Sequence, residues 1–175
     1  DPFLIDVNIH PTKMDVKFSK IEELKDLIDR LCEIFGGMTL ICWIQNFSFE
    51  WSFMKGHFEW NKNKDGFPDI FAKTDRNILT ARYRNIEFRD SMALTAMSLA
   101  RYQKNYNLDV GKLSGDLDYK LARHTGTKLT DQEIAYCIND VQVLNDWQRK
   151  YIFPVYLENN LSIPLTSTGI VREDI

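Results

Sequence analysis

The sequence predicts an α/β domain with a mixed sheet and flanking helices. Three observations lead to this fold class. A continuous apolar run covers residues 38–44, and residues 69–91 alternate between apolar and polar side chains, as strands do. Apolar residues with helical spacing cover 21–31 and 134–144, so predicted helices precede and follow these strands.

The N-terminal part predicts two strands and a helix. Residues 3–9 alternate like a half-buried strand that stops before a proline, and a second short strand follows at 14–18. Ser19 is placed to cap a helix, with Glu22 three residues later to complete a capping box. We expect this helix to end at the glycine pair 36–37.

The middle of the chain predicts the main sheet. The run 38–44 is apolar apart from Thr39, which suits a fully buried central strand better than an edge strand. An aromatic-rich helix is predicted for 47–58, a loop for 61–66 and a meander of two or three strands for 69–91.

Helices predominate in the C-terminal part. Residues 91–106 have a helical pattern, and the stretch 111–116 is predicted to be a loop. Thr130 is placed to cap a long final helix, and Glu133 would close its capping box.

The composition is that of an ordinary globular protein of 175 residues, with 44% hydrophobic and 27% charged residues. The net charge of −3 comes from residues 1–37, and the remaining residues are neutral overall. Such neutrality is compatible with an enzyme whose acidic side chains hold metal ions while its basic side chains contact DNA. Cys32, Cys42 and Cys137 are far apart, which predicts buried thiols and no zinc site. No run of about 18 apolar residues exists to span a bilayer, so we expect a cytoplasmic protein without a membrane partner.

Three acidic positions are candidates for metal chemistry. Tyr136 and Asp140 are spaced i, i+4, which places phenol and carboxylate on one face of the last helix. Glu50 follows the strand 38–44 near its carboxyl end, where α/β proteins commonly place ligands, although a first-turn acid facing the helix dipole would also explain it. Asp116 lies in a predicted loop, where a solvated turn is the alternative. Together these carboxylates are the components of a two-metal phosphodiester-cleaving centre.

Three sequence blocks resemble motifs of one protein family. Residues 46–50, Asn-Phe-Ser-Phe-Glu, resemble the Exo II motif of family B DNA polymerase exonucleases, and residues 136–140, Tyr-Cys-Ile-Asn-Asp, resemble Exo III. Residues 115–119, Gly-Asp-Leu-Asp-Tyr, resemble a block of the protein-primed, phage-type subgroup, and the order and separation of the blocks agree. The ending, 163–172, resembles the connection to the polymerase domain. From about residue 38 to 175, the chain therefore resembles the 3′–5′ proofreading exonuclease domain of such a polymerase.

The resemblance implies a fold and an activity. The fold would be RNase H-like (DnaQ-like), incomplete at the N-terminus, and the activity would be 3′–5′ hydrolysis of single-stranded DNA. Glu50, Asp140 and Asp116 would be ligands of Mg²⁺ or Mn²⁺. Tyr136 would orient the attacking water.

The resemblance also implies partners. Asn46 and Phe49 would contact the 3′ end of single-stranded DNA, with Phe49 stacking on a base. Asp90 and Ser91 match a less specific pair that touches DNA in relatives. A terminal protein is a further partner that protein priming implies.

The chain departs from the family pattern in three places. Gln45 stands where a histidine is usual and Ser114 where lysine is frequent, and both changes weaken the inferred DNA contacts more than the metal site. The first motif, an Asp-x-Glu strand, is missing ahead of the Exo II block. Asp6 with Asn8 or Asp15 would replace it only if their strands lay in the right place.

Residues 1–35 resemble a different family. The block 10–18, His-Pro-Thr-Lys-Met-Asp-Val-Lys-Phe, is similar to a segment of the MutL mismatch-repair ATPases, where the lysine matching Lys13 reaches the γ-phosphate of ATP bound by a preceding domain. Without that domain we expect Lys13 to be an exposed loop lysine. We therefore expect a truncated or chimeric chain, with three parts: a MutL-like segment over 1–37, an exonuclease domain over 38–160 and a connection toward a polymerase domain over 161–175.

Three functions remain open at this point. The first is a 3′–5′ exonuclease that belongs to a DNA-directed DNA polymerase. The second is a catalytically inactive, single-stranded nucleic-acid-binding fragment, because the acids of the first motif are missing. The third is a MutL-type mismatch-repair fragment, which ATP binding dependent on Lys13 would favour.

Overall fold

The computed structural model describes residues 5–9, 14–18, 20–74, 76–113 and 128–173, with side chains from residue 20 to 170. The chain divides into two compact units. The first unit contains residues 1–24 and 98–162, and the second unit contains residues 25–97 and 163–175.

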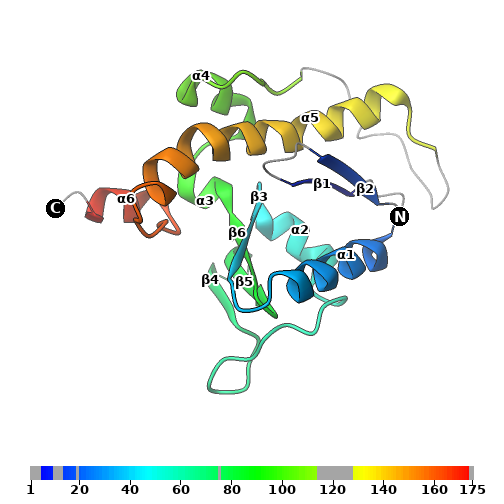
Figure 1. Ribbon diagram of the computed structural model, residues 1–175, viewed down its shortest axis with the longest axis vertical. Coiled ribbons are helices and arrows are strands. Elements are labelled where there is room, and N and C mark those ends of the chain that lie inside the picture. Colours follow the sequence, from blue (N-terminus) through cyan, green and yellow to red (C-terminus); the bar gives the residue numbers. More distant parts are fainter. Residues whose placement is uncertain (1–4, 10–13, 19, 75, 114–127, 174–175) are drawn as a thin grey trace. The chain divides into compact units, whose positions relative to one another are not determined.

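The second unit is built on a four-stranded mixed sheet with the strand order β3-β6-β5-β4 (Figure 1). β3 (Leu40–Ile44) pairs parallel to β6 (Ile86–Asp90). β4 (Ile70–Thr74), β5 (Asn77–Tyr83) and β6 are joined antiparallel. The predicted α/β class with a mixed sheet is confirmed, and the predicted meander consists of three strands.

The prediction that the apolar run 38–44 forms a central strand is wrong. β3 begins at Leu40, and among the described strands it pairs only with β6, so it lies at one edge of the sheet. Only Trp43 of this strand is buried. The apolar run therefore predicted too much burial for this strand, and the pairing of its backbone edges leaves no mark in the pattern of side chains.

An aromatic core fills the space between α2 (Phe47–Met54) and the strands β5 and β6. Phe47 is fully buried and stacks on Phe88, with ring centroids 6.1 Å apart. The helix predicted to reach Phe58 ends at Met54, because Gly56 follows and Trp60 Nε1 donates to the carbonyl of Lys55.

The helix α1 (Ile21–Ile34) is tied to the β5–β6 turn by Asp29. The Asp29 carboxylate accepts from Tyr83 Oη at 2.7 Å and from the Arg84 guanidinium at 3.0 Å, and Lys25 Nζ lies 2.7 Å away. The helix ends at Ile34, just before the glycine pair 36–37. Gly37 has a positive φ of 90°, which a helix cannot continue, so the predicted C-terminal end is confirmed. Ser19, the predicted cap, lies outside the described residues.

The predicted helix 91–106 is three elements. α3 (Ser91–Thr95) ends at Ala96, whose backbone is left-handed with φ 54°. A 3-10 turn (Leu99–Arg101) and α4 (Tyr102–Tyr106) follow, and both belong to the first unit. Thr95 Oγ1 accepts from the backbone of Met97 and so holds the turn that periodicity could not foresee. α3 packs against α6 (Ser167–Glu173) in the second unit.

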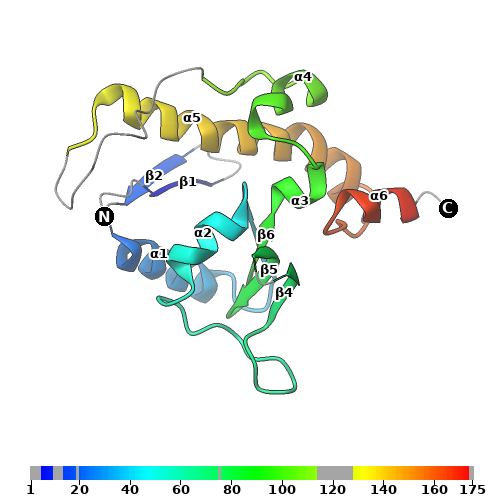
Figure 2. The same cartoon turned by 180° about the vertical axis from the view of Figure 1, so that it is seen from behind.

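The first unit combines a hairpin with a long helix. β1 (Ile5–Ile9) and β2 (Met14–Phe18) pair antiparallel, and β1 contacts α5 (Asp131–Trp147), as Figure 2 shows. Both strands and the long helix are as predicted. Thr130 and Glu133 form the predicted capping box, and the helix continues as a π-helix over Gln148–Leu157.

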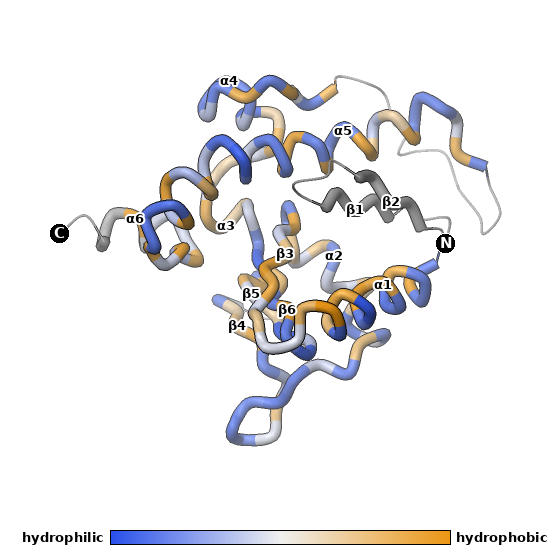
Figure 3. The backbone as a smooth tube through the Cα atoms, viewed as in Figure 1, coloured by the Kyte–Doolittle hydropathy of each residue, from blue (hydrophilic) through white to orange (hydrophobic). Residues whose placement is uncertain are grey.

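In Figure 3 the connection that contains residues 61–66 is hydrophilic, in agreement with the predicted loop. Within the described parts of the chain, no helix is long and apolar enough to cross a membrane.

Candidate functional site

The segment that resembles Exo II follows the end of β3. Asn46 adopts a left-handed backbone, with φ 58° and ψ 56°, which asparagine tolerates better than most residues. Its backbone N–H donates to Asp90 Oδ1 at 3.1 Å. The preceding Gln45 accepts from Ser91 Oγ at 2.7 Å through Oε1 and donates to the carbonyl of Met97 at 3.3 Å. The chain is therefore fixed at the point where α2 begins.

The helix α2 has a core face and an exposed aromatic face. Phe47 is fully buried, and Ser48 Oγ accepts from the backbone of Ile78 at 2.9 Å, so the rotation of the helix is set. Phe49 is consequently presented outward, with 57% of its surface exposed. Phe53, one turn later, is 37% exposed and packs edge-on against Phe49, with ring centroids 5.2 Å apart.

Glu50 lies between these two faces and is half-buried. Burial raises the pKa of its carboxyl group, since the charged form is less well solvated there. Its carboxylate forms no ion pair with any side chain in the described part of the chain. This is the environment of an acid that would gain from a cation.

Asp90 and Ser91 are buried rather than exposed. Asp90 is 4% exposed, accepts from Met92 N at 2.9 Å as the N-cap of α3, and also holds Asn46. Ser91 is fully buried and holds Gln45. Their geometry positions the Exo II-like segment, and direct contact with DNA stays a prediction.

Tyr136 and Asp140 share one face of α5, where Lys112 reaches both. Lys112 Nζ lies 3.7 Å from Asp140 Oδ2 and 5.3 Å from the centre of the Tyr136 ring. Burial raises the pKa of Asp140, although the nearby Lys112 acts in the opposite direction. Asp140 Oδ1 is buried and accepts no hydrogen bond from the described residues.

The predicted site residues fall into two groups. Asn46, Phe49, Glu50 and the pair 90–91 lie together in the second unit. Tyr136 and Asp140 lie in the first. Asp116 is outside the described residues, and among the residues that are described no group of three His, Cys, Asp or Glu could hold a metal ion.

The donor chemistry fits a divalent cation. Carboxylate oxygens are the ligands that Mg²⁺ and Mn²⁺ prefer. Glu50 and Asp140 are both partly buried acids, and Asp140 Oδ1 is a buried acceptor without a hydrogen-bond donor. Such an atom costs free energy unless a ligand satisfies it.

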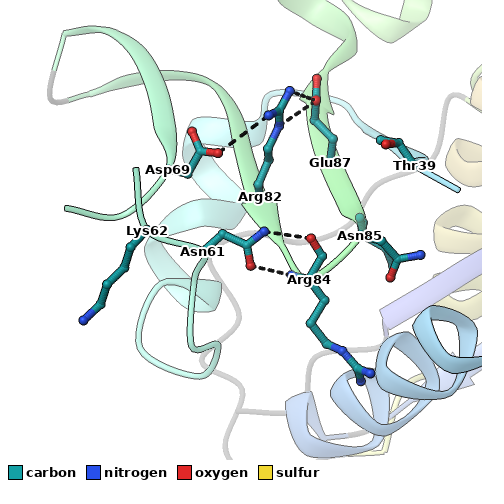
Figure 4. A pocket seen from close by; sticks show the side chains of 9 residues that line it. Thr39, Asn61, Lys62, Asp69, Arg82, Arg84, Asn85 and Glu87 are labelled. Carbon is teal, nitrogen blue, oxygen red and sulfur yellow. Dashed lines mark hydrogen bonds and ion pairs between the residues drawn. The ribbon is translucent and has the colours of Figure 1, made fainter. Parts of the chain in front are cut away.

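A separate hollow of about 240 Å³ in the second unit is lined mostly by polar and charged side chains (Figure 4). Its arginines are paired within the protein: Arg82 lies 2.7 Å from Glu87 and 3.7 Å from Asp69, and Arg84 binds Asp29. Burial alone would raise the pKa of Glu87, but hydrogen bonds and charge from Arg82 and Arg89 outweigh it and lower the pKa. The lining residues are Thr39, Asn61, Lys62, Asp69, Arg82, Arg84, Asn85, Ile86 and Glu87.

Two residues of the site were missed by sequence reasoning. Lys112 lies in a predicted loop and meets Asp140 only through the fold, so no local pattern could identify it. Phe53 could have been found, because it is spaced i, i+4 from Phe49.

Solved structures with a similar fold are DNA polymerases. One is Phi29 DNA polymerase complexed with single-stranded DNA, with a TM-score of 0.60 and 19% identity over 87% of this chain and 27% of the polymerase chain. The same polymerase in a ternary complex with primer-template DNA and incoming nucleotides gives a TM-score of 0.62, with the same identity and coverage.

Sequence comparison points to the same polymerase. The DNA polymerase of Bacillus phage phi29 is 27% identical over 128 residues, which cover 63% of this chain and 19% of that protein. A short second similarity is to the DNA mismatch repair protein MutL of Geobacillus kaustophilus, 50% identical over 42 residues, or 23% of this chain and 7% of that protein. No model of a known protein family matches the chain. The chain thus spans about a fifth of the phage polymerase that it resembles.

Proposed function

We propose that the chain is the 3′–5′ exonuclease part of a family B DNA polymerase and removes nucleotides from the 3′ end of single-stranded DNA. The observation that carries this proposal is the similarity of the chain, in sequence and in fold, to a phage DNA polymerase. The parallel pairing of β3 with β6 inside an otherwise antiparallel sheet supports an RNase H-like fold.

The start of α2 would bind the DNA end. Asn46 and Phe49 both have exposed side chains, and stacking of a base on the Phe49 ring requires such exposure. Asp90 and Ser91 would act on DNA through the segment 45–46, since their own side chains are buried against it.

The acids would hold Mg²⁺ or Mn²⁺, with Glu50, Asp140 and Asp116 as ligands. When bound, the cations would activate the attacking water and stabilise the leaving oxygen. Tyr136 would orient that water with its phenol, one helical turn from Asp140. A terminal protein as partner stays a prediction.

An inactive module that binds single-stranded nucleic acid is the second candidate. Two observations favour it: no Asp-x-Glu precedes Glu50, and the described residues include no group of three that could hold a metal. The MutL-type reading is favoured by the short similarity alone, and Lys13, on which it depends, lies outside the described residues.

The test is degradation of an oligonucleotide labelled at its 5′ end, with Mg²⁺ or Mn²⁺, by wild type, Asp140→Asn and the control Asp131→Asn. The control removes the same charge from the exposed first turn of α5. We expect stepwise shortening from the 3′ end that Asp140→Asn slows by about a hundredfold or more, as loss of a metal ligand does.

Each other outcome has a defined meaning. No shortening by wild type, with retained binding of the oligonucleotide, would favour the inactive module. If wild type neither shortens nor binds the oligonucleotide, both candidates are rejected. Binding of ATP that depends on Lys13 would then favour the MutL-type fragment.

A further inference from the structure

The segment 109–112 is held firmly along α5. Asp146 Oδ2 accepts from the backbone of Asp109 at 2.7 Å and of Val110 at 3.3 Å. Asn139 Nδ2 donates to the carbonyl of Gly111 at 2.8 Å. Lys150 Nζ lies 2.7 Å from the Asp109 carboxylate. Anchors on both sides of Gly111 therefore fix the backbone from which the next side chain extends.

Lys112 is consequently directed to the face of α5 that carries the candidate chemistry. Its ammonium group lies 3.7 Å from Asp140 Oδ2 and over the ring of Tyr136, at 5.3 Å. The Lys112 side chain is 32% exposed and that of Asp140 is 30% exposed, so the pair lies at a half-buried boundary with water. An ion pair in such a place is weak enough to open.

One ammonium group leaves the carboxylate only partly satisfied. Asp140 Oδ1 remains buried without a hydrogen-bond donor among the described residues, although Oδ2 faces Lys112. A divalent cation carries twice the charge of the ammonium group and could be bound by both carboxylate oxygens. The two cations compete for one carboxylate.

We infer that Lys112 is a built-in counter-ion of Asp140, which a divalent metal ion must displace before the metal can bind there. This inference rests on the proposed function, since it takes Asp140 as a metal ligand. Lys112 then sets the metal concentration at which the site fills, and it keeps Asp140 neutralised when metal is scarce. The displaced ammonium group becomes accessible to solvent.

Affinity for Mn²⁺ alone tests the competition, measured from the free-ion signal in electron paramagnetic resonance. Lys112→Met should bind Mn²⁺ about threefold to tenfold more tightly than wild type, as expected for the removal of a competing ion pair at a half-buried position. Lys104→Met is the matched control, because it removes the same charge from the same unit at an exposed position of α4, away from the anchors of the segment 109–112. We expect its affinity to equal that of wild type.

Acetylation of the wild-type amines tests the displacement without any substitution. Mass spectrometry should show that the reaction rate of Lys112 rises when Mn²⁺ is added, whereas that of Lys150 stays constant. In Asp140→Asn the rate at Lys112 should no longer depend on Mn²⁺, because the carboxylate for which the two cations compete has lost its charge.

Two results would overturn the inference in different ways. If Asp140→Asn leaves the Mn²⁺ affinity unchanged, Asp140 is not a metal ligand, and both the inference and the metal part of the proposed function are wrong. In the second result, Asp140→Asn weakens Mn²⁺ binding, but Lys112→Met has wild-type affinity and the acetylation rate of Lys112 does not change with Mn²⁺. Only the counter-ion role is then wrong.

Discussion

Asp90 offers a sharp test of how the segment proposed to bind DNA is positioned. Its Oδ1 accepts two backbone hydrogen bonds, from Asn46 at 3.1 Å and from Met92 at 2.9 Å, and the residue is 4% exposed. Asp90→Ala removes both bonds, which join a buried carboxylate to partly buried backbone N–H groups. Asp90→Asn retains an acceptor oxygen at the same position.

The magnitude follows from these two bonds. Loss of an N-cap aspartate costs about 0.5 to 2 kcal/mol. The N–H of Asn46, left without its acceptor, adds about 1 to 3 kcal/mol. We therefore expect Asp90→Ala to lower the free energy of unfolding of the second unit by about 1.5 to 5 kcal/mol, and Asp90→Asn by about 1 kcal/mol.

The pH dependence has a definite sign. Burial raises the pKa of Asp90, although backbone hydrogen bonds from Met92, Phe47 and Asn46 act against it. Because the folded state disfavours the ionised form, the Asp90 contribution to stability declines as pH rises from the ordinary aspartate pKa through the raised one. Asp90→Asn should not show this decline.

Unfolding in urea, followed by tryptophan fluorescence, measures the effect. Trp43, Trp51 and Trp60 lie in the second unit, so the signal reports mainly on the unit that contains Asp90. Asp65→Ala, in an exposed loop of the same unit, is the control and should change little. The reasoning would be refuted if Asp90→Ala unfolded within about 0.5 kcal/mol of wild type.

Two further predictions concern Asp29 and Phe49. Burial alone would raise the pKa of Asp29, but hydrogen bonds from Lys25, Tyr83 and Arg84 outweigh it and lower the pKa to about 2. The stabilisation by Asp29 is therefore complete above pH 4 and lost as pH falls toward 2, so wild type should exceed Asp29→Asn by about 1 to 2 kcal/mol at pH 7 but not at pH 2. Phe49→Ala should weaken binding of single-stranded DNA by about tenfold in fluorescence anisotropy, while stability is kept, because the ring is exposed.

Controls separate these effects from general damage. Asp26→Asn, on the same helix but exposed, should have wild-type stability at both pH values. An equal gap between wild type and Asp29→Asn at pH 7 and pH 2 would contradict the role of the lowered pKa. Unchanged DNA affinity in Phe49→Ala would remove Phe49 from the proposed binding surface.

Local patterns predicted most of the elements and failed where long-range pairing decides. The capping box of Thr130 and Glu133 was readable because both partners lie within one helical turn. The edge position of β3 could not be predicted, because an apolar run carries no information about which strands pair with it. The break at Ala96 depends on a side-chain bond from Thr95, which periodicity does not register.

The candidate site was predictable in composition and only partly in geometry. Motif resemblance identified Glu50, Tyr136 and Asp140 as candidate site residues, but it did not identify the lysine that lies beside Tyr136 and Asp140. Lys112 reaches Asp140 across 28 positions of sequence, through anchors that only the folded chain forms. Asp90 was expected at the DNA, and its burial shows that polar residues beside a site can serve to shape it.

The acids of the first motif, Asp-x-Glu, which residues 1–49 do not contain, decide between the two proposed functions. The four-stranded sheet contains no Asp-x-Glu strand among its described residues. Asp6 and Asn8 belong to β1, which pairs with β2 in a separate sheet and contacts α5, the helix of Asp140. If Asp6 and Asn8 replaced the missing acids, they would act from a hairpin beside that helix, and the proposed metal-dependent hydrolysis would depend on them. The proposed binding of single-stranded DNA does not depend on such an acid, because α2 alone presents Phe49. A chain that hydrolyses DNA must therefore also bind it, whereas a chain that binds DNA need not hydrolyse it.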